Sequence, residues 1–148
     1  MAQVDRHVAA APDEVFAVLA DGWSYSNWVV GASHIRAVDA AWPAAGSTLH
    51  HASGNWPLTL DDETRVETLD PGRSLVLLAR GRPLGEARIE LTVTPEDGGT
   101  RVTMTESPVS GPGHWLHNPV SEFLLAKRNE ESLARLAAIA ERRTTPGG

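Results

Sequence analysis

Two carboxylates fall on the apolar faces of predicted strands, where they could carry out proton transfer. Glu106 shares one strand face with Val102 and Met104, and Asp62 shares another with Val66. A carboxyl group buried on such a face has its pKa raised by desolvation and can act as a general acid or base. Two alternatives stay open. The strand could end near Glu106 and leave that side chain at a solvated rim, and a bulge near Asp62 would turn its side chain outward.

Two histidines add a second kind of proton-transfer group. His50 and His51 are adjacent in a predicted strand, so their side chains must point to opposite faces of the sheet. Leu49 shares its face with His51, which favours His51 on the inner side. An inward histidine could shuttle protons or hydrogen-bond a ligand. It could equally be a structural side chain whose hydrogen bonds are satisfied.

The last quarter of the chain predicts one long helix whose apolar stripe is interrupted by polar residues. At about 100° per residue, seven residues fall in one sector: Asn118, Glu122, Leu125, Asn129, Leu133, Leu136 and Ala140. Arg128 and Arg135 fall on the far side. A buried amide or carboxylate without a partner costs several kcal/mol, so the helix is expected to cover a partly wet cavity. Asn129 could bind a ligand hydroxyl or carbonyl there, or make a structural bond to backbone or to an ordered water.

Aromatic residues complete the candidate ligand site. The chain has five tryptophans, and indole rings suit flat apolar ligands. Trp28 and Trp56 are expected to close the mouth of the cavity, with core packing or turn anchoring as the alternative. The catalytic candidates are Glu106, His51 and Asp62. The candidate ligand-binding residues are Trp28, His51, Trp56, Asp62, Met104, Glu106, Glu122, Leu125 and Asn129.

Motifs for metals, phosphates and hydrolysis are weak or missing from the sequence. His114 and His117 have the i, i+3 spacing of a helical metal pair, but no third ligand is identifiable. The segment 81–85 reads as a hairpin turn with no phosphate-loop pattern, and Ser53 lacks the context of a hydrolase nucleophile. We therefore expect no metal and no cofactor.

These side chains must be positioned by an alternation of strands with a few helices. A helix is predicted from Pro12, because proline fits the first helical position and Asp13 and Glu14 favour the positive end of the dipole. A second short helix is expected over 23–30. Period-two alternation and turn residues predict strands over 3–9, 35–40, 47–53, 58–69, 74–80, 87–94 and 100–107, followed by a helix from about 115 to 142.

Consecutive strands joined by short turns build an antiparallel meander. The expected fold is therefore α+β: a curved antiparallel sheet of about seven strands wrapped around the long C-terminal helix, with two short helices after the first strand. Only that last helix is long enough to cover the apolar face of the sheet. A strongly twisted sheet around a helix leaves space for a ligand pocket.

Composition narrows the function classes. The 148 residues favour a single domain over 1–148, and the net charge of −6 argues against nucleic acid as a partner. The chain has no cysteine, which excludes disulfides and fits a reducing compartment. No stretch approaches the ~18 apolar residues of a membrane span and the N-terminus has no apolar signal segment, so we expect a cytoplasmic protein without membrane insertion.

Six segments of the chain carry a family resemblance: 12–16 (PDEVF), 28–32 (WVVGA), Trp42-Pro43 through Gly46-Ser47, 55–57 (NWP), 99–102 (GTRV) and 128–133 (RNEESL). With the order of elements, they resemble the START/Bet v 1-like (SRPBCC) helix-grip superfamily, and within it the small bacterial polyketide cyclase/dehydrase-like proteins. The superfamily includes lipid and hormone carriers, cyclases, quinone-binding proteins and co-chaperone domains. The resemblance therefore implies a fold but does not select a function.

Three functions follow from these expectations. The first is binding of a small hydrophobic molecule, such as a polyketide, lipid or quinone, in a cavity between the sheet and the last helix. The second is a polyketide cyclase, aromatase or dehydratase that uses acid–base residues in that cavity. The third is a protein-interaction domain. Val120, Phe123 and Leu124 could form a dimer contact or pack under a loop, so both a monomer and a homodimer stay open.

Overall fold

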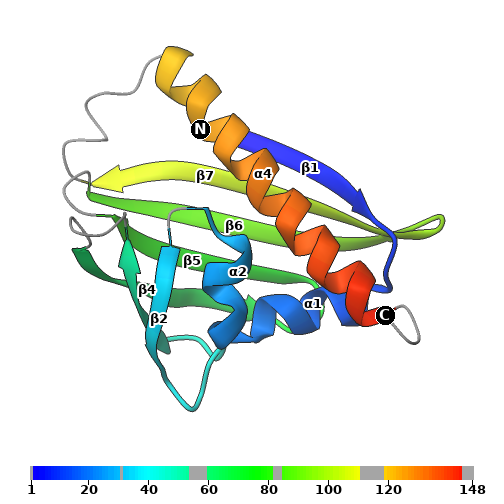
Figure 1. Ribbon diagram of the computed structural model, residues 1–148, viewed down its shortest axis with the longest axis horizontal. Helices are drawn as coiled ribbons and strands as arrows, with labels where there is room; N and C mark the ends of the chain where they lie inside the picture. The colour runs from blue at the N-terminus through cyan, green and yellow to red at the C-terminus, as the bar shows by residue number, and fades with distance from the viewer. Residues whose placement is uncertain (1, 31, 54–59, 82–84, 111–118, 145–148) are drawn as a thin grey trace.

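The computed structural model describes residues 2–30, 32–53, 60–81, 85–110 and 119–144. One seven-stranded antiparallel sheet, in the order β1-β7-β6-β5-β4-β3-β2, curves behind a long helix, α4 (Figure 1). The strands are β1 (Ala2–Val8), β2 (Ala32–Val38), β3 (Thr48–Ser53), β4 (Leu60–Asp70), β5 (Ser74–Gly81), β6 (Gly85–Glu96) and β7 (Gly99–Ser110). The helices are α1 (Pro12–Ala20), the 3-10 turn η1 (Gly22–Ser24), α2 (Tyr25–Trp28) and α4 (Pro119–Thr144). The helix-grip architecture expected from the sequence is confirmed.

Helix α1 begins where the sequence predicts. Pro12 occupies its first turn together with Asp13 and Glu14, and its inner side buries Val15 and Phe16. The second short helix is briefer than predicted. A 3-10 turn leads into α2, and the backbone becomes extended at Val29.

Helix α4 crosses the concave side of the sheet in front of β1 and β7, and its C-terminal end lies beside α1 (Figure 1). Its last four turns bury an aliphatic stripe of Leu133, Leu136, Ala137 and Ala140. Arg142 and Arg143 close the helix at the end where cations favour the dipole. The core between this stripe and the sheet is therefore solid over the C-terminal half of the helix.

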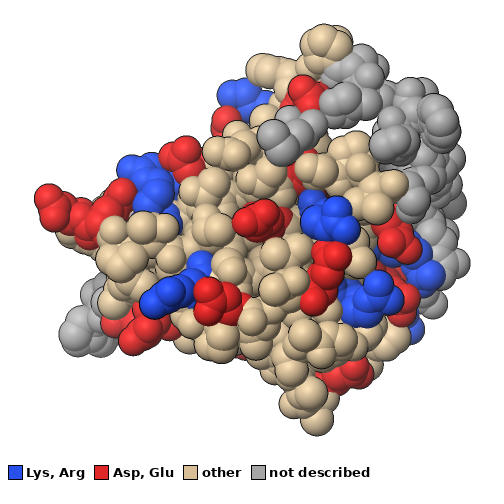
Figure 2. Space-filling view, turned by 180° about the vertical axis from the view of Figure 1, so that it is seen from behind, with Lys and Arg blue, Asp and Glu red and all other residues tan. Residues whose placement is uncertain are grey.

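The sheet alternates as half-buried strands require. On β6, Ile89, Leu91 and Val93 are buried while Arg88 and Glu90 are exposed. On the side of the molecule away from α4, acidic and basic side chains are interspersed (Figure 2). Arg88 and Glu67 pair there at 2.7 Å between Nε and Oε2. This outer face reads as an ordinary solvated surface.

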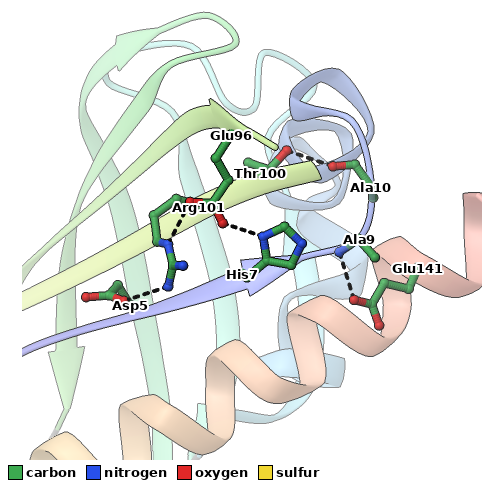
Figure 3. A network of polar contacts seen from close by, with 8 residues as sticks. All are labelled: Asp5, His7, Ala9, Ala10, Glu96, Thr100, Arg101 and Glu141. Carbon is green, nitrogen blue, oxygen red and sulfur yellow. Dashed lines mark hydrogen bonds and ion pairs between the residues drawn. The ribbon is translucent and has the colours of Figure 1, made fainter. Parts of the chain in front are cut away.

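One end of the sheet is held to the helices by polar contacts (Figure 3). The Thr100 hydroxyl donates to the Ala10 carbonyl at 2.7 Å, and the Ala9 amide donates to Glu141 Oε2 at 2.9 Å. Gly99 allows the close approach that these bonds need, because a Cβ there would lie 2.1 Å from the Val8 carbonyl oxygen. The junction of β1, β7 and α1 is thus fixed at the end of the molecule opposite the candidate site residues Asp62 and Glu106.

Within the described segments, no helix combines the length and apolarity needed to cross a membrane.

Candidate functional site

A buried carboxylate lies at the centre of the site. Glu106 on β7 is 7% exposed, and its two oxygens accept hydrogen bonds from Arg128 Nη2 at 2.8 and 2.9 Å. Asn129 Nδ2 donates to Glu106 Oε1 at 3.1 Å. One arginine and one amide, adjacent on α4, therefore compensate the charge of this carboxylate and orient it.

The amide of Asn129 is only half satisfied. The residue is 1% exposed, and its Oδ1 has no hydrogen-bond partner within the described part of the chain. The bond from Nδ2 to Glu106 fixes which way the amide points. The helix thus presents a buried acceptor whose desolvation cost, about 1–3 kcal/mol, is not offset by a donor from the described segments.

A hydrogen-bonded chain of three side chains lies on the neighbouring elements. The Tyr25 hydroxyl is 3.2 Å from Thr64 Oγ1, and His51 Nε2 is 3.1 Å from the same oxygen. The Tyr25 ring also lies 5.6 Å from the His51 ring, centroid to centroid. Helix α2, strand β4 and strand β3 each contribute one member, so only the tertiary fold assembles this chain.

Burial sets the protonation of two members of the chain. Desolvation lowers the pKa of His51 below its ordinary value, although the charge of Asp62 opposes the shift. Desolvation also raises the pKa of Tyr25 to about 12, with the Thr64 hydrogen bond opposing that shift. Near neutral pH both side chains are therefore uncharged. The Tyr25 phenol and the His51 imidazole are thus linked through the Thr64 hydroxyl by hydrogen bonds between uncharged groups.

Asp62 lies directly across from His51 in the β3–β4 register, and it is buried. Its Oδ1 is 3.5 Å from Arg80 Nε. Strands β4 and β5 thus provide a second carboxylate–guanidinium pair, next to the imidazole.

Tyr25 interacts with both the Glu106–Arg128 pair and the His51–Thr64 pair. Its pKa responds to the charges of Glu106 and Arg128 as well as to Thr64, so the phenol lies within electrostatic range of the α4 cluster. Its ring meets the Trp28 ring edge-on at 5.7 Å. Trp28 is 2% exposed and its Nε1 has no hydrogen-bond partner in the described segments. Six side chains from β3, β4, β7 and α4 are called the inner polar site from here on: His51, Asp62, Thr64, Glu106, Arg128 and Asn129.

Several predictions about orientation are confirmed. His51, and not His50, points inward. Strand β7 continues to Ser110, so Glu106 does not end at a solvated rim. A bulge does occur in β4, but it lies between Val66 and Thr68, beyond Asp62, and therefore leaves Asp62 on the inner face.

Other predictions fall elsewhere. Trp28 lies inside the core, so its expected place at a cavity mouth is wrong, because α2 packs it against Tyr25. Met104 is buried in the core, and Glu122 and Leu125 are half-buried on the first turns of α4. Trp56, His114, His117 and Asn118 lie outside the described residues. Among the described residues, no three His, Asp or Glu side chains are grouped to hold a metal.

Sequence reasoning missed four contributors: Tyr25, Thr64, Arg80 and Arg128. The helical projection put Arg128 on the far side of α4, which agrees with its exposure but does not anticipate its contact with Glu106. Its side chain is 42% exposed but bends back to reach Glu106, as a long amphipathic side chain can. The sequence did contain a signal for this contact: Arg128 is adjacent to the inward Asn129, and the inward Glu106 carboxylate needs a cationic partner. Thr64 shares the strand parity of Asp62, so its inward position was readable.

A surface hollow of about 310 Å³ lies between β1 and α4, lined by Gln3, Val4, Asp5, Arg6, Glu130 and Leu133. It includes none of the six residues of the inner polar site.

Comparison with known proteins identifies the family. Residues 2–141 match the family described as polyketide cyclase / dehydrase and lipid transport. The chain belongs to this family. This is the polyketide cyclase/dehydrase family that the resemblance implied. A search of the curated proteins returned no match.

Solved structures share the fold at low sequence identity. Protein NE0264 from Nitrosomonas europaea is 16% identical with a TM-score of 0.73, over 95% of this chain and 94% of that one. The di-domain ARO/CYC StfQ of the steffimycin biosynthetic pathway is 15% identical with a TM-score of 0.72, over 95% of this chain and 50% of that one. Ara h 8.0201 is 10% identical with a TM-score of 0.70, over 93% and 95%. At these identities the likeness shows the fold alone.

Proposed function

We propose that this member of the polyketide cyclase / dehydrase and lipid transport family binds a small hydrophobic molecule between the sheet and the N-terminal half of α4. The observation that carries the proposal is that two buried polar atoms, Asn129 Oδ1 and Trp28 Nε1, have no hydrogen-bond partner among the described residues. A solid protein core seldom leaves such atoms unpaired, because each costs about 1–3 kcal/mol. A guest with hydrogen-bonding groups would offset that cost.

The character of the surrounding side chains supports the same proposal. Tyr25 and Trp28 supply aromatic surface, and Met104 on β7 and Leu77 on β5 are buried on the sheet. Apolar walls with a few fixed polar groups are typical of small-molecule sites. Family membership makes polyketide-, lipid- and quinone-like molecules the first compounds to test.

The second candidate function is catalysis of a cyclisation, aromatisation or dehydration. It is favoured by the Tyr25–Thr64–His51 chain with Asp62 beside the imidazole. Such reactions need a proton removed at one atom and returned at another. Neutral His51 can accept a proton and the Tyr25 phenol can donate one, so both roles have a candidate.

Native mass spectrometry of the protein purified from its own host tests the binding function. We expect a small organic adduct that leaves on denaturation, that is retained in Asn27→Leu and that is lost or weakened in Asn129→Leu. Asn27 is the matched control because it is exposed on α2. Wild-type protein that carries no adduct, and that also takes up no aromatic polyketide, fatty acid or quinone when these are supplied, would refute the proposal.

The two functions separate on a second measurement. A binding protein with Tyr25→Phe or His51→Gln takes up the same adduct and returns it chemically unchanged, as the wild type does. If the wild type converts the adduct to a product and these variants bind it without converting it, the protein is an enzyme that uses this chain.

A further inference from the structure

We propose that the molecule bound at the inner polar site is uncharged and carries a hydroxyl group, whose O–H donates to Asn129 Oδ1. This inference rests on the binding function proposed above and adds the chemical class of the guest. It follows from which charges in the site are already compensated and which buried atoms are left without a partner.

The first charge in the site is balanced within the protein. Glu106 accepts two hydrogen bonds from Arg128 and one from Asn129, at 2.8 to 3.1 Å. A carboxylate on the guest would compete with Glu106 for Arg128 and leave one of the two anions buried and uncompensated. A cation on the guest would meet Arg128 beside it. Either would carry the desolvation cost of a buried charge.

Within the described residues, the second charge faces a guanidinium at ion-pair distance, without the hydrogen bonds that hold Glu106. Asp62 is buried, and its Oδ1 lies 3.5 Å from Arg80 Nε. His51 adds no charge near neutral pH, since burial lowers its pKa, and Tyr25 remains a phenol because burial raises its pKa. The inner polar site together with Arg80 therefore holds two carboxylates and two guanidiniums, so its formal charges sum to zero without a charge on the guest.

The atoms left over specify the polar groups of the guest. Asn129 Oδ1 can only accept a hydrogen bond, so it requires a donor from the guest. Trp28 Nε1 can only donate, so it requires an acceptor oxygen. A hydroxyl supplies the donor, and a second hydroxyl or a carbonyl supplies the acceptor. The Tyr25 and Trp28 rings favour a flat carbon skeleton for the rest of the molecule.

Three commercial naphthalenes test this class directly. In equilibrium dialysis at neutral pH, 2-naphthol offers a neutral O–H donor, 2-methoxynaphthalene keeps the ring and the oxygen without the donor, and 2-naphthoate adds a negative charge. We expect 2-naphthol to bind at least about fivefold more tightly than the methyl ether, the value of one net hydrogen bond. We expect 2-naphthoate to bind more than about 100-fold more weakly than 2-naphthol, because its charge is buried without a partner.

Variants assign the difference to Asn129. In Asn129→Leu the preference for 2-naphthol over its methyl ether should disappear, whereas Asn27→Leu should keep it. The comparison of the three compounds on the wild type does not depend on how well the variant folds. Equal binding of 2-naphthol and the ether, or stronger binding of 2-naphthoate, would overturn this inference and leave hydrophobic binding standing. If none of the three binds, this inference falls, and the binding function falls with it only if the protein also carries no adduct and takes up no aromatic polyketide, fatty acid or quinone.

Discussion

The pairing of Arg128 with Glu106 is the contact whose removal should cost the protein most among its ion pairs on α4. Replacing Arg128 by Met keeps an apolar stem of similar length but leaves the Glu106 carboxylate with one donor, the Asn129 amide. Breaking a fully buried pair costs about 3–5 kcal/mol. Because the Arg128 side chain is 42% exposed, water screens part of the interaction, and we expect a loss of about 2–3 kcal/mol in the free energy of unfolding.

A double-mutant cycle isolates the pair. Glu106→Gln alone should cost about 1 kcal/mol, since the amide keeps an acceptor for Arg128 but loses the charge. The double variant should be more stable than the sum of the two losses predicts, by about 1–2 kcal/mol. Urea unfolding followed by the fluorescence of the five tryptophans measures all four proteins.

The matched control is a solvent-exposed ion pair on the same helix. Arg135 pairs with Glu131 at 3.1 Å between Nε and Oε1, with both side chains about half exposed, so Arg135→Met should cost no more than about 0.5 kcal/mol. If Arg128→Met costs no more than Arg135→Met, or if the coupling between Arg128 and Glu106 is no larger than that between Arg135 and Glu131, the site is more solvated than its burial indicates. The charge-balance reasoning for the guest would then lose its basis.

Three further predictions follow from the same structure. Burial lowers the pKa of His51, so below about pH 6.5 the unfolded chain binds a proton that the folded chain does not bind. The free energy of unfolding of the wild type should therefore fall more steeply than that of His51→Gln as the pH drops from about 7 to 5.5. Urea unfolding at several pH values measures this, and an equal pH dependence for the two proteins would contradict it. Tyr25 is the sole tyrosine of the chain, with its pKa raised to about 12, so near-ultraviolet absorbance should show no phenolate at pH 10, and an early titration would mean that the phenol is solvated. Gly99→Ala would put a Cβ 2.1 Å from the Val8 carbonyl oxygen and should cost more than about 2 kcal/mol, whereas a Cβ at Gly98 meets nothing closer than 3.9 Å and Gly98→Ala should cost about 1 kcal/mol; equal melting temperatures for the two variants would refute the contact.

Local sequence signals were sufficient for the elements themselves. The alternation of Ile89, Leu91 and Val93 with polar neighbours predicted both the strand and its buried face, because side chains alternate with a period of two in a strand but not in a helix. Pro12 marked the start of α1 for the same kind of local reason. Strand parity also predicted that Glu106, Asp62 and His51 share the inner side of the sheet, because register shifts were absent between them and their buried neighbours.

The hydrogen-bond partners of these side chains, in contrast, could not be predicted from local patterns, because the partners are far apart in the sequence. Tyr25 and Thr64 are 39 positions apart, and Glu106 and Arg128 are 22 apart. A helical projection places each Cα on one side of α4, but it ignores the reach of a long side chain, and so it did not predict that Arg128 contacts Glu106.

The sequence by itself determined which side chains turn inward, because periodicity along a strand or helix is a property of the backbone alone. The tertiary structure decided which inward groups satisfy one another and which remain unsatisfied. That depends on how the curved sheet brings β3, β4 and β7 up to α2 and α4. Asn129 was recognisable as an inward amide from its spacing, but only the fold directed its Nδ2 to Glu106 and left its Oδ1 with no hydrogen-bond partner among the residues that the structure describes.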